Sequence, residues 1–158
     1  MRVGIGCDSH KFTADRPLVL GGVTIAYKYG LDGHSDGDVL IHAIIDAILG
    51  AAALGDIGSH FPSNDPQYQG VQSTSLLAKA NHLLIKSGWQ VQNVDATIVA
   101  EHPRLSNYGL QMRQSIESCI GLEAGLVSIK ATTTDGLGFT GRGEGIAAQA
   151  IACIEPIS

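Results

Sequence analysis

Hydrophobic and polar positions follow two periods along the chain, and each period predicts a different kind of element. Residues 39–54 are apolar at almost every position. Asp38 precedes this run, and His42 and Asp46 interrupt it, so that the three polar residues are spaced four apart. Positions four apart stack on one face of an α-helix, so the segment predicts a nearly buried helix with one narrow polar file. We expect Ser35 to cap its start. The file needs an explanation, because an ordinary surface helix has a broad polar face.

The other segments predict a hairpin, two more helices and four long strands. The hairpin turns at Gly21-Gly22 between two β-rich arms, and residues 54–70 form a loop rich in Gly, Pro, Asn and Asp. Segment 144–154 fits a strand or a short helix, and the need for a sheet partner favours the strand. The predicted helices are 73–88, capped by Ser73 or Thr74, and 107–121; the predicted strands are 2–10, 89–101, 127–134 and 144–154.

This order of elements predicts an α+β fold in one domain that spans residues 1–158. We expect a mixed four-stranded sheet of the split βαβ (ferredoxin-like) type, with helices on one face and a small β-hairpin beside it.

Composition narrows the classes of function. The net charge is −5 and the ten Lys and Arg residues are scattered, which argues against a nucleic-acid partner. The longest apolar run is short and contains His42 and Asp46, so we expect no membrane span. The start of the chain lacks the apolar region of a signal peptide. Three separate cysteines without a CxxC pair suit a reducing compartment, so we expect a cytoplasmic protein whose thiols are small core residues.

Asp8 and His10 form the first candidate site together with His42. Residues two apart in a strand point to the same side, so Asp8 and His10 emerge together at the end of the first strand. With His42 they would give Zn²⁺ three protein ligands and leave one coordination position open. Asp38 and Asp46 would then orient the His42 imidazole from one turn away. The alternative is a solvated strand end and an ordinary core histidine, with Asp38 facing the helix dipole.

The segment 130–145 is the second candidate site. Three threonines end a predicted strand there, and five glycines follow between 136 and 145. Hydroxyls and accessible backbone N–H groups make an anion cradle, with Arg142 as its cation. Asp135 could hold Mg²⁺ against phosphates or cap a turn. The spacing matches neither a P-loop nor a dinucleotide-binding fingerprint, and a generic Gly-rich turn remains an alternative.

Taken together, these segments resemble the 2-C-methyl-D-erythritol 2,4-cyclodiphosphate synthase family over essentially the whole chain. The resemblance runs from "GCDSH" through "HSDGDVLIHAIIDAILGAAALGDIG" and "FPSNDP" to "KATTTDGLGFTGRGEGIAAQA". It implies a homotrimer with an active site at each subunit boundary. It also implies conversion of 4-diphosphocytidyl-2-C-methyl-D-erythritol 2-phosphate into the 2,4-cyclodiphosphate with release of CMP, in the non-mevalonate isoprenoid pathway. The enzyme would be a metal-dependent phosphorus–oxygen lyase.

The resemblance also implies roles for individual residues. Asp8, His10 and His42 would hold Zn²⁺, and His34 and Thr133 would stabilise the transition state. Asp135 would help to hold Mg²⁺ or Mn²⁺ at the substrate diphosphate. The residues implied in substrate binding are Ser35, Asp56, Ile57, Gly58, Phe61, Pro62, Ser63, Asn64 and Asp65 at the erythritol phosphate, Ala100, Pro103, Arg104, Leu105, Ser106, Ala131 and Thr132 at the cytidine, and Thr134, Phe139 and Arg142 at the phosphates.

Three positions depart from the pattern of that family, and none belongs to the zinc ligands. Asp135 stands where Glu is usual, Ser63 where the loop usually has a carboxylate, and Arg104 where Lys is common. Two other functions remain alternatives. A zinc-dependent phosphohydrolase would use a metal-bound hydroxide, with Asp46 or Asp56 as its base. A cytidine nucleotide- or metal-binding module would bind without turnover.

Overall fold

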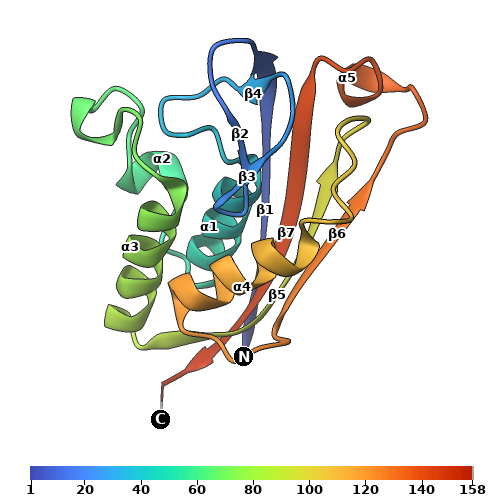
Figure 1. Cartoon of the computed structure of the whole chain (residues 1–158). Helices are drawn as coiled ribbons and strands as arrows, with labels where there is room; N and C mark the ends of the chain where they lie inside the picture. The colour runs from blue at the N-terminus through green and yellow to red at the C-terminus, as the bar shows by residue number, and fades with distance from the viewer. Residues whose placement is uncertain (158) are drawn as a thin grey trace.

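The computed structural model describes residues 1–157, and a mixed sheet forms its centre (Figure 1). Strand β7 lies between β1 and β5 and is antiparallel to both, whereas β5 and β6 are adjacent and parallel. The strand order is β4-β1-β7-β5-β6, with β1 at Arg2–Thr13, β4 at Gly30–Leu31, β5 at Trp89–Val99, β6 at Val127–Thr132 and β7 at Gly145–Pro156. A separate hairpin pairs β2, Leu18–Leu20, with β3, Val23–Ile25.

The predicted α+β class, mixed sheet and hairpin are confirmed, and residues 144–154 do form a strand. The predicted number of four strands is wrong, because the two residues of β4 pair with Phe12 and Thr13 at the end of β1. Two residues are too few to leave an alternating pattern in the sequence. The ferredoxin-like detail is not confirmed, because β5 and β6 are parallel neighbours with helix α4 between them in sequence.

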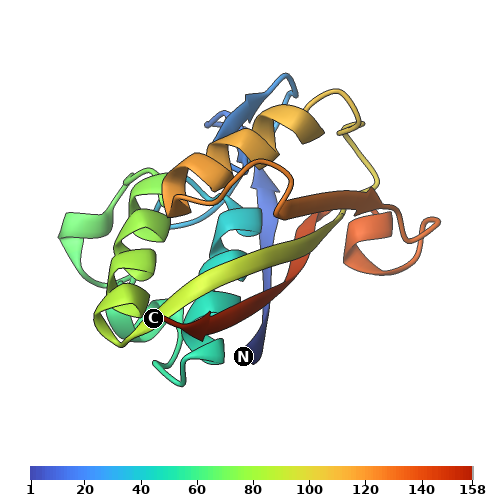
Figure 2. The same cartoon turned by 90° about the horizontal axis from the view of Figure 1, so that it is seen from below.

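The three long helices pack on one face of the sheet, as Figures 1 and 2 show. The predicted loop 54–70 contains two short helical turns, and segment 130–145 contains another. The helices are α1 at Val39–Ala51, α2 at Ile57–His60, α3 at Ser73–Lys86, α4 at Gly109–Ile120 and α5 at Gly138–Gly141, with a 3₁₀ turn, η1, at Pro66–Tyr68. Within residues 1–157, no helix is long and apolar enough to cross a bilayer.

The predicted helix caps need correction. The N-cap of α1 is Asp38 rather than Ser35, because the Asp38 carboxylate accepts a hydrogen bond from the backbone N–H of Ile41. Helix α3 has Gln72 at its N-cap position, without a side-chain cap, and Ser73 is already its first residue. Ser35 and Ser73 are therefore both buried polar residues that do not cap a helix.

The close contact between α1 and the sheet depends on two glycines of β1. A Cβ atom built on Gly4 would lie 2.1 Å from the carbonyl oxygen of Ala47, and one on Gly6 would lie 1.9 Å from that of Ala43. Real side chains cannot approach backbone atoms so closely, so glycine is required at both positions. The same strand continues to Asp8 and His10, and the same helix carries His42. The contact therefore brings the predicted zinc ligands of the two elements together.

The opposite face of the sheet carries no helix in Figures 1 and 2. Strand alternation directs Val3 and Ile5 of β1 and Ile151 of β7 to this open face, where they are 63%, 67% and 47% exposed. Cys7 also lies exposed on β1, so its prediction as a core residue is wrong. Large exposed apolar side chains on one sheet face are typical of a surface that another molecule covers.

Candidate metal centre and active site

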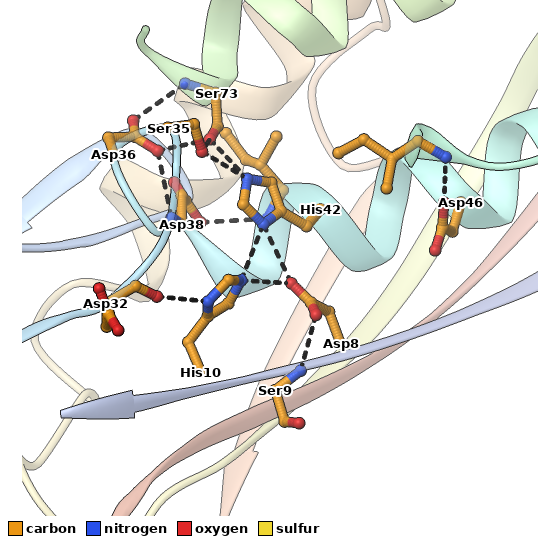
Figure 3. A network of polar contacts seen from close by, with 12 residues as sticks. Asp8, Ser9, His10, Asp32, Ser35, Asp36, Asp38, His42, Asp46 and Ser73 are labelled. Carbon is orange, nitrogen blue, oxygen red and sulfur yellow. Dashed lines mark hydrogen bonds and ion pairs between the residues drawn. The ribbon is translucent and has the colours of Figure 1, made fainter. Parts of the chain in front are cut away.

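Asp8, His10 and His42 lie together at the end of β1, against the first turn of α1 (Figure 3). Alternation along β1 turns Asp8 and His10 toward the helices. The Nε2 atom of His10 lies 2.8 Å from Asp8 Oδ2, and the Nδ1 atom of His42 lies 3.0 Å from the same oxygen. The two ring nitrogens are 3.1 Å apart. Three donor atoms from two elements therefore converge on one point.

This arrangement fits a divalent metal ion. Ligands about 2.0–2.1 Å from a tetrahedral Zn²⁺ lie roughly 3.3 Å from one another, close to the spacing of these three donors. The other ring nitrogen of His10, Nδ1, is 2.5 Å from the carbonyl oxygen of Asp32. A carbonyl oxygen only accepts, so Nδ1 carries the hydrogen and Nε2 has its lone pair for a cation. In the part of the chain that the structure describes, this is the one such cluster of three.

The pKa values of the cluster are coupled. Burial by itself raises the pKa of Asp8, but the charged forms of His10 and His42 donate hydrogen bonds to it and attract it, which outweighs burial and holds the pKa below its usual range. Burial would lower the pKa of His10, but the hydrogen bond and the charge of Asp8 raise it above the ordinary 6.5. The site therefore favours positive charge, which a proton or a metal ion can supply.

Asp38 and Asp46 do not orient His42, and that prediction is wrong. The Asp38 carboxylate accepts hydrogen bonds from the backbone of Gly21 at 2.9 Å and of Gly22 at 2.7 Å, in the hairpin turn. Asp46 accepts from the backbone N–H of Ile57 at 2.7 Å and so holds the start of α2. The polar file of α1 therefore serves three purposes, and His42 alone faces the candidate metal centre.

A pocket of about 270 Å³ opens beside the three donors, and we call it the metal-side pocket. Sequence reasoning missed Tyr68 and Leu76 in its lining, because an aromatic in a loop and a core position in a helix gave no functional signal. Its lining residues are Asp8, His10, His34, Ser35, His42, Ile57, Gly58, Phe61, Ser63, Tyr68 and Leu76.

The other residues predicted for the erythritol phosphate lie outside this lining. Asp56 caps α2 by accepting from the N–H of Ser59 at 2.8 Å, and Asp65 caps η1 by accepting from the N–H of Gln67 at 3.0 Å. The carbonyl oxygen of Asp65 also lies 3.0 Å from Nε2 of His34. Pro62 and Asn64 belong to the same loop without a place in the lining. The loop thus holds His34 through its backbone.

A second pocket, of about 350 Å³, lies where the parallel strands β5 and β6 end, and we call it the nucleotide-side pocket. Crevices at the carboxyl ends of parallel strands are common ligand sites. It gathers every residue predicted for the cytidine, together with Glu101 of the same segment and Thr133. Its lining residues are Ala100, Glu101, Pro103, Arg104, Leu105, Ser106, Ala131, Thr132 and Thr133.

The residues predicted for the phosphate cradle follow Thr133 in the chain, and most of them are exposed. Arg142 is exposed and donates to Glu144 at 2.7 Å, while Thr134 contacts the hydroxyl of Thr140 at 3.0 Å. Asp135 has a left-handed backbone, with φ of 53°, and accepts from the Thr133 hydroxyl at 3.3 Å. Phe139 is 40% exposed and lines a hollow of about 260 Å³ beside Cys7 of the open sheet face. Neither the metal-side nor the nucleotide-side pocket is lined by Thr134, Asp135, Phe139 or Arg142.

The two predicted stabilisers, His34 and Thr133, lie in different pockets of the chain. His34 lines the metal-side pocket and Thr133 the nucleotide-side pocket, and the two linings share no residue. Strand β7 lies between β1, which carries Asp8 and His10, and β5, whose end borders the nucleotide-side pocket. The structure therefore does not bring His34 and Thr133 together within one chain.

The sequence model of the YgbB family matches residues 1–155. The chain belongs to the YgbB family. This YgbB-family chain is 55% identical over 155 residues to a protein of Desulfatibacillum aliphaticivorans, covering 98% of this chain and 100% of the relative. It is 56% identical over 154 residues to a protein of Alkaliphilus oremlandii, covering 98% of both. Both relatives are named 2-C-methyl-D-erythritol 2,4-cyclodiphosphate synthase, so the family resemblance is confirmed.

Solved structures share the fold. The bifunctional IspDF of Campylobacter jejuni aligns with a TM-score of 0.96 at 39% identity, over 99% of this YgbB-family chain and 42% of that longer chain. An IspF–CDP complex from Plasmodium falciparum aligns with a TM-score of 0.86 at 33% identity, over 99% and 97% of the two chains. The arrangement of strands and helices is therefore the same as in these two solved structures.

Proposed function

We propose that this chain is a 2-C-methyl-D-erythritol 2,4-cyclodiphosphate synthase, a phosphorus–oxygen lyase of the non-mevalonate isoprenoid pathway. Its substrate is 4-diphosphocytidyl-2-C-methyl-D-erythritol 2-phosphate, and its products are the 2,4-cyclodiphosphate and CMP. The observation that carries the proposal is an identity of 50% or more, over nearly the full length, to relatives of that name. The convergence of Asp8, His10 and His42 supports it.

In this reaction the substrate supplies its own nucleophile. An oxygen of the 2-phosphate attacks the β-phosphorus and forms the new phosphorus–oxygen bond that closes the ring. The bond from the β-phosphorus to the bridging oxygen breaks, and CMP leaves with that oxygen. The chain therefore needs no activated Ser, Cys or Lys. It must position two phosphate groups and neutralise their charge, which is most of the catalysis in phosphoryl transfer.

Zn²⁺ is the ion that we propose for Asp8, His10 and His42. Two imidazoles and one carboxylate are typical ligands of catalytic zinc and leave a position open. When bound, Zn²⁺ would supply a Lewis acid and a template at the β-phosphate. The chain itself holds the three donors in place through the contact of β1 with α1 and through the carbonyl of Asp32.

His34 and Ser35 are proposed to contact the phosphate of the erythritol, together with the start of α2 at Ile57-Gly58. All of them line the metal-side pocket. The contact of His34 Nε2 with the carbonyl of Asp65 holds the ring beside that pocket. His34 would stabilise the charge of the transition state from this side, and Thr133 would do so from the side of the nucleotide.

The nucleotide-side pocket is proposed to hold the cytidine and its α-phosphate. Arg104 in its lining is a suitable phosphate ligand. The CDP complex of the Plasmodium falciparum relative supports a nucleotide as the ligand. We place a second ion, Mg²⁺ or Mn²⁺, beside Asp135, because Mg²⁺ needs only one or two carboxylates when substrate phosphates and water supply its other ligands.

A homotrimer with active sites between subunits would join the two kinds of pocket. One chain carries the metal donors and the nucleotide-side pocket on different strands. A substrate bound between subunits would contact the metal donors of one subunit and the nucleotide-side pocket of its neighbour. The exposed Val3, Ile5 and Ile151 offer a surface for such an assembly. The cytoplasmic location remains a prediction from the sequence.

The test is to incubate the purified protein with the cytidyl substrate, Zn²⁺ and Mg²⁺ in water enriched in ¹⁸O. We expect CMP and a cyclic diphosphate without ¹⁸O, seen by ³¹P NMR and mass spectrometry. An opened phosphate that contains ¹⁸O would indicate the phosphohydrolase instead. Binding of CMP without turnover under any metal would indicate a binding module. Either result would contradict the proposal.

A further inference from the structure

His42 has a ring nitrogen that faces away from Asp8, and two hydroxyl groups lie against it (Figure 3). Its Nε2 atom is 3.0 Å from Oγ of Ser73 and 3.0 Å from Oγ of Ser35. Ser73 is fully buried at the first residue of α3. Its hydroxyl also contacts the carboxylate of Asp36, which accepts from the Ser73 backbone N–H at 2.9 Å. A chain of polar contacts thus runs from Asp36 through Ser73 to His42.

The direction of each hydrogen bond in this chain follows from counting protons. The Asp36 carboxylate faces three donors, namely the N–H and hydroxyl of Ser73 and the N–H of Asp38, so it accepts throughout. Ser73 has one hydroxyl hydrogen and gives it to Asp36. Toward His42 it then has only lone pairs, so Nε2 of His42 must carry a hydrogen and donate it. A neutral imidazole has one N–H, so Nδ1 has its lone pair. Asp8 competes for a hydrogen at Nδ1 from 3.0 Å away, and a metal ion held between Nδ1 and Asp8 removes that competition.

Ser35 cannot set this direction by itself. Among the contacts of residues 1–157, its hydroxyl meets only Nε2 of His42 and, at 3.4 Å, the hydroxyl of Ser73. With no carboxylate behind it, the Ser35 hydroxyl can donate to His42 or accept from it. Ser73 is held by Asp36 and offers a single direction. The tautomer of His42 therefore depends on the pair Asp36–Ser73.

We propose that Asp36 and Ser73 are positioning residues, which fix the Nε2–H tautomer of His42 and leave Nδ1 free to ligate the metal ion. The inference rests on the metal site proposed above. Outer partners of this kind set the orientation of a ligand imidazole and raise metal affinity. The carbonyl of Asp32 has the corresponding role for His10, so each imidazole is held from behind by an acceptor. Helix α3 thereby contributes to metal binding without supplying a ligand.

The first test is the affinity for Zn²⁺, measured by competition with a chromogenic chelator. In Asp36→Asn, only one of the two side-chain positions can still accept, so three donors compete for it and the Ser73 hydroxyl is no longer held to one direction. Part of the imidazole hydrogen should then move to Nδ1, where the metal should bind. We expect affinity to fall about 10- to 100-fold. Ser73→Ala should also weaken binding. Ser75→Ala, an exposed position in the same turn of α3, is the matched control and should bind as wild type does.

The second test reads the tautomer from the ¹⁵N NMR spectrum of metal-free protein with labelled histidines, at about pH 9, where ordinary imidazoles are neutral. We expect Nε2–H to predominate for His42 in the wild type, and the share of Nδ1–H to rise in Asp36→Asn and in Ser73→Ala. A purely structural role would not shift the tautomers. Wild-type Nδ1–H, or Asp36→Asn with unchanged zinc affinity, would overturn the inference. Failure of the wild type to bind zinc would instead contradict the metal site, and the tautomer measurement would still decide the role of Asp36.

Discussion

The two pockets of this chain differ in how their polar groups are held. At the metal-side pocket, His42 of α1 contacts Asp8 of β1 and, behind the pocket, Ser73 of α3, so the contacts join three elements across the fold. Around the nucleotide-side pocket, the polar side chains of residues 132–144 contact near neighbours in sequence and are mostly exposed. The difference teaches that the hydrophobic core fixes the metal donors before any ligand binds. We expect the segment 132–144 to obtain more of its geometry from what binds there.

The largest effect that we expect comes from His42→Ala, which breaks the metal-side pocket alone. One of three ligands is lost, so the protein should not retain stoichiometric zinc, and turnover should fall by about 10³-fold or more, because a Lewis acid contributes several kcal/mol to such a transition state. Binding of CMP should change little, because His42 does not line the nucleotide-side pocket. Metal analysis, kinetics and CMP calorimetry measure the three quantities. Full zinc content in the variant would refute the ligand assignment.

Gly6→Ala tests whether the packing of β1 on α1 is what holds the donors together. The new Cβ would lie 1.9 Å from the carbonyl oxygen of Ala43, so strand and helix must separate. We expect a loss of about 3 kcal/mol in the free energy of unfolding, together with weaker zinc binding. Chemical denaturation and chelator competition are the measurements.

Gly50→Ala is the matched control for that prediction. Gly50 lies in α1, and its added Cβ would meet only Ile5 O, at 4.0 Å. Because alanine favours helix over glycine, stability should rise by up to about 1 kcal/mol, and zinc binding should not change. If the two variants behaved alike, close packing at Gly6 would not be what positions the donors.

Local periodicity made the convergence of the donors one of two alternatives, and the family resemblance decided in its favour. The two-residue spacing of Asp8 and His10 and the four-residue steps around His42 each define a face, and a core can bury only one face of a strand against a helix. Periodicity predicts on which face of its helix or strand a residue lies, but it does not predict which residue it contacts. Asp38 and Asp46 share the face of His42, yet they bind the hairpin turn and the start of α2, which only the tertiary structure brings close.

Other features had no signal in the sequence for similar reasons. Ser73 was predicted as a helix cap, because Ser before an apolar run usually caps a helix, and its contact with His42 spans 31 residues. Strand β4 is two residues long. Tyr68 and Leu76 line a pocket that arises from the meeting of distant segments. In each case the contact is long-range, and patterns along the chain report only local geometry.

The buried carboxylate of Asp38 should make the stability of the protein depend on pH, in contrast to the exposed side chains of residues 132–144. Burial raises the pKa of Asp38 to about 6, against the hydrogen bonds from Gly22 and Ile41, which lower it. A folded pKa above the unfolded value of 3.8 means that the folded state binds more protons, so stability falls as the pH rises from 4 to 6.

The comparison of wild type with Asp38→Asn isolates this contribution, because the variant lacks the titrating group. The difference in unfolding free energy, wild type minus variant, should fall by about 2 to 3 kcal/mol between about pH 4 and pH 7. Denaturant titrations at several pH values measure it. A difference that grows with pH would show that the three backbone N–H groups around Asp38 stabilise its charge more than burial opposes it.

The smallest effect that we expect concerns Arg142. A variant of this residue tests whether the side chains of residues 132–144 take up their binding geometry only when the substrate is bound. The Arg142 guanidinium is exposed and paired with Glu144, and an exposed pair adds little to stability. Arg142→Ala should therefore leave the melting temperature unchanged and raise KM for the cytidyl substrate about tenfold, because a charge-assisted contact to phosphate is lost. Glu144→Gln removes only the competing carboxylate, so its KM should stay equal or fall. If both variants raised KM equally, the Arg142–Glu144 pair would act as one preformed unit, and the contrast between the two pockets would not extend to this end of the site.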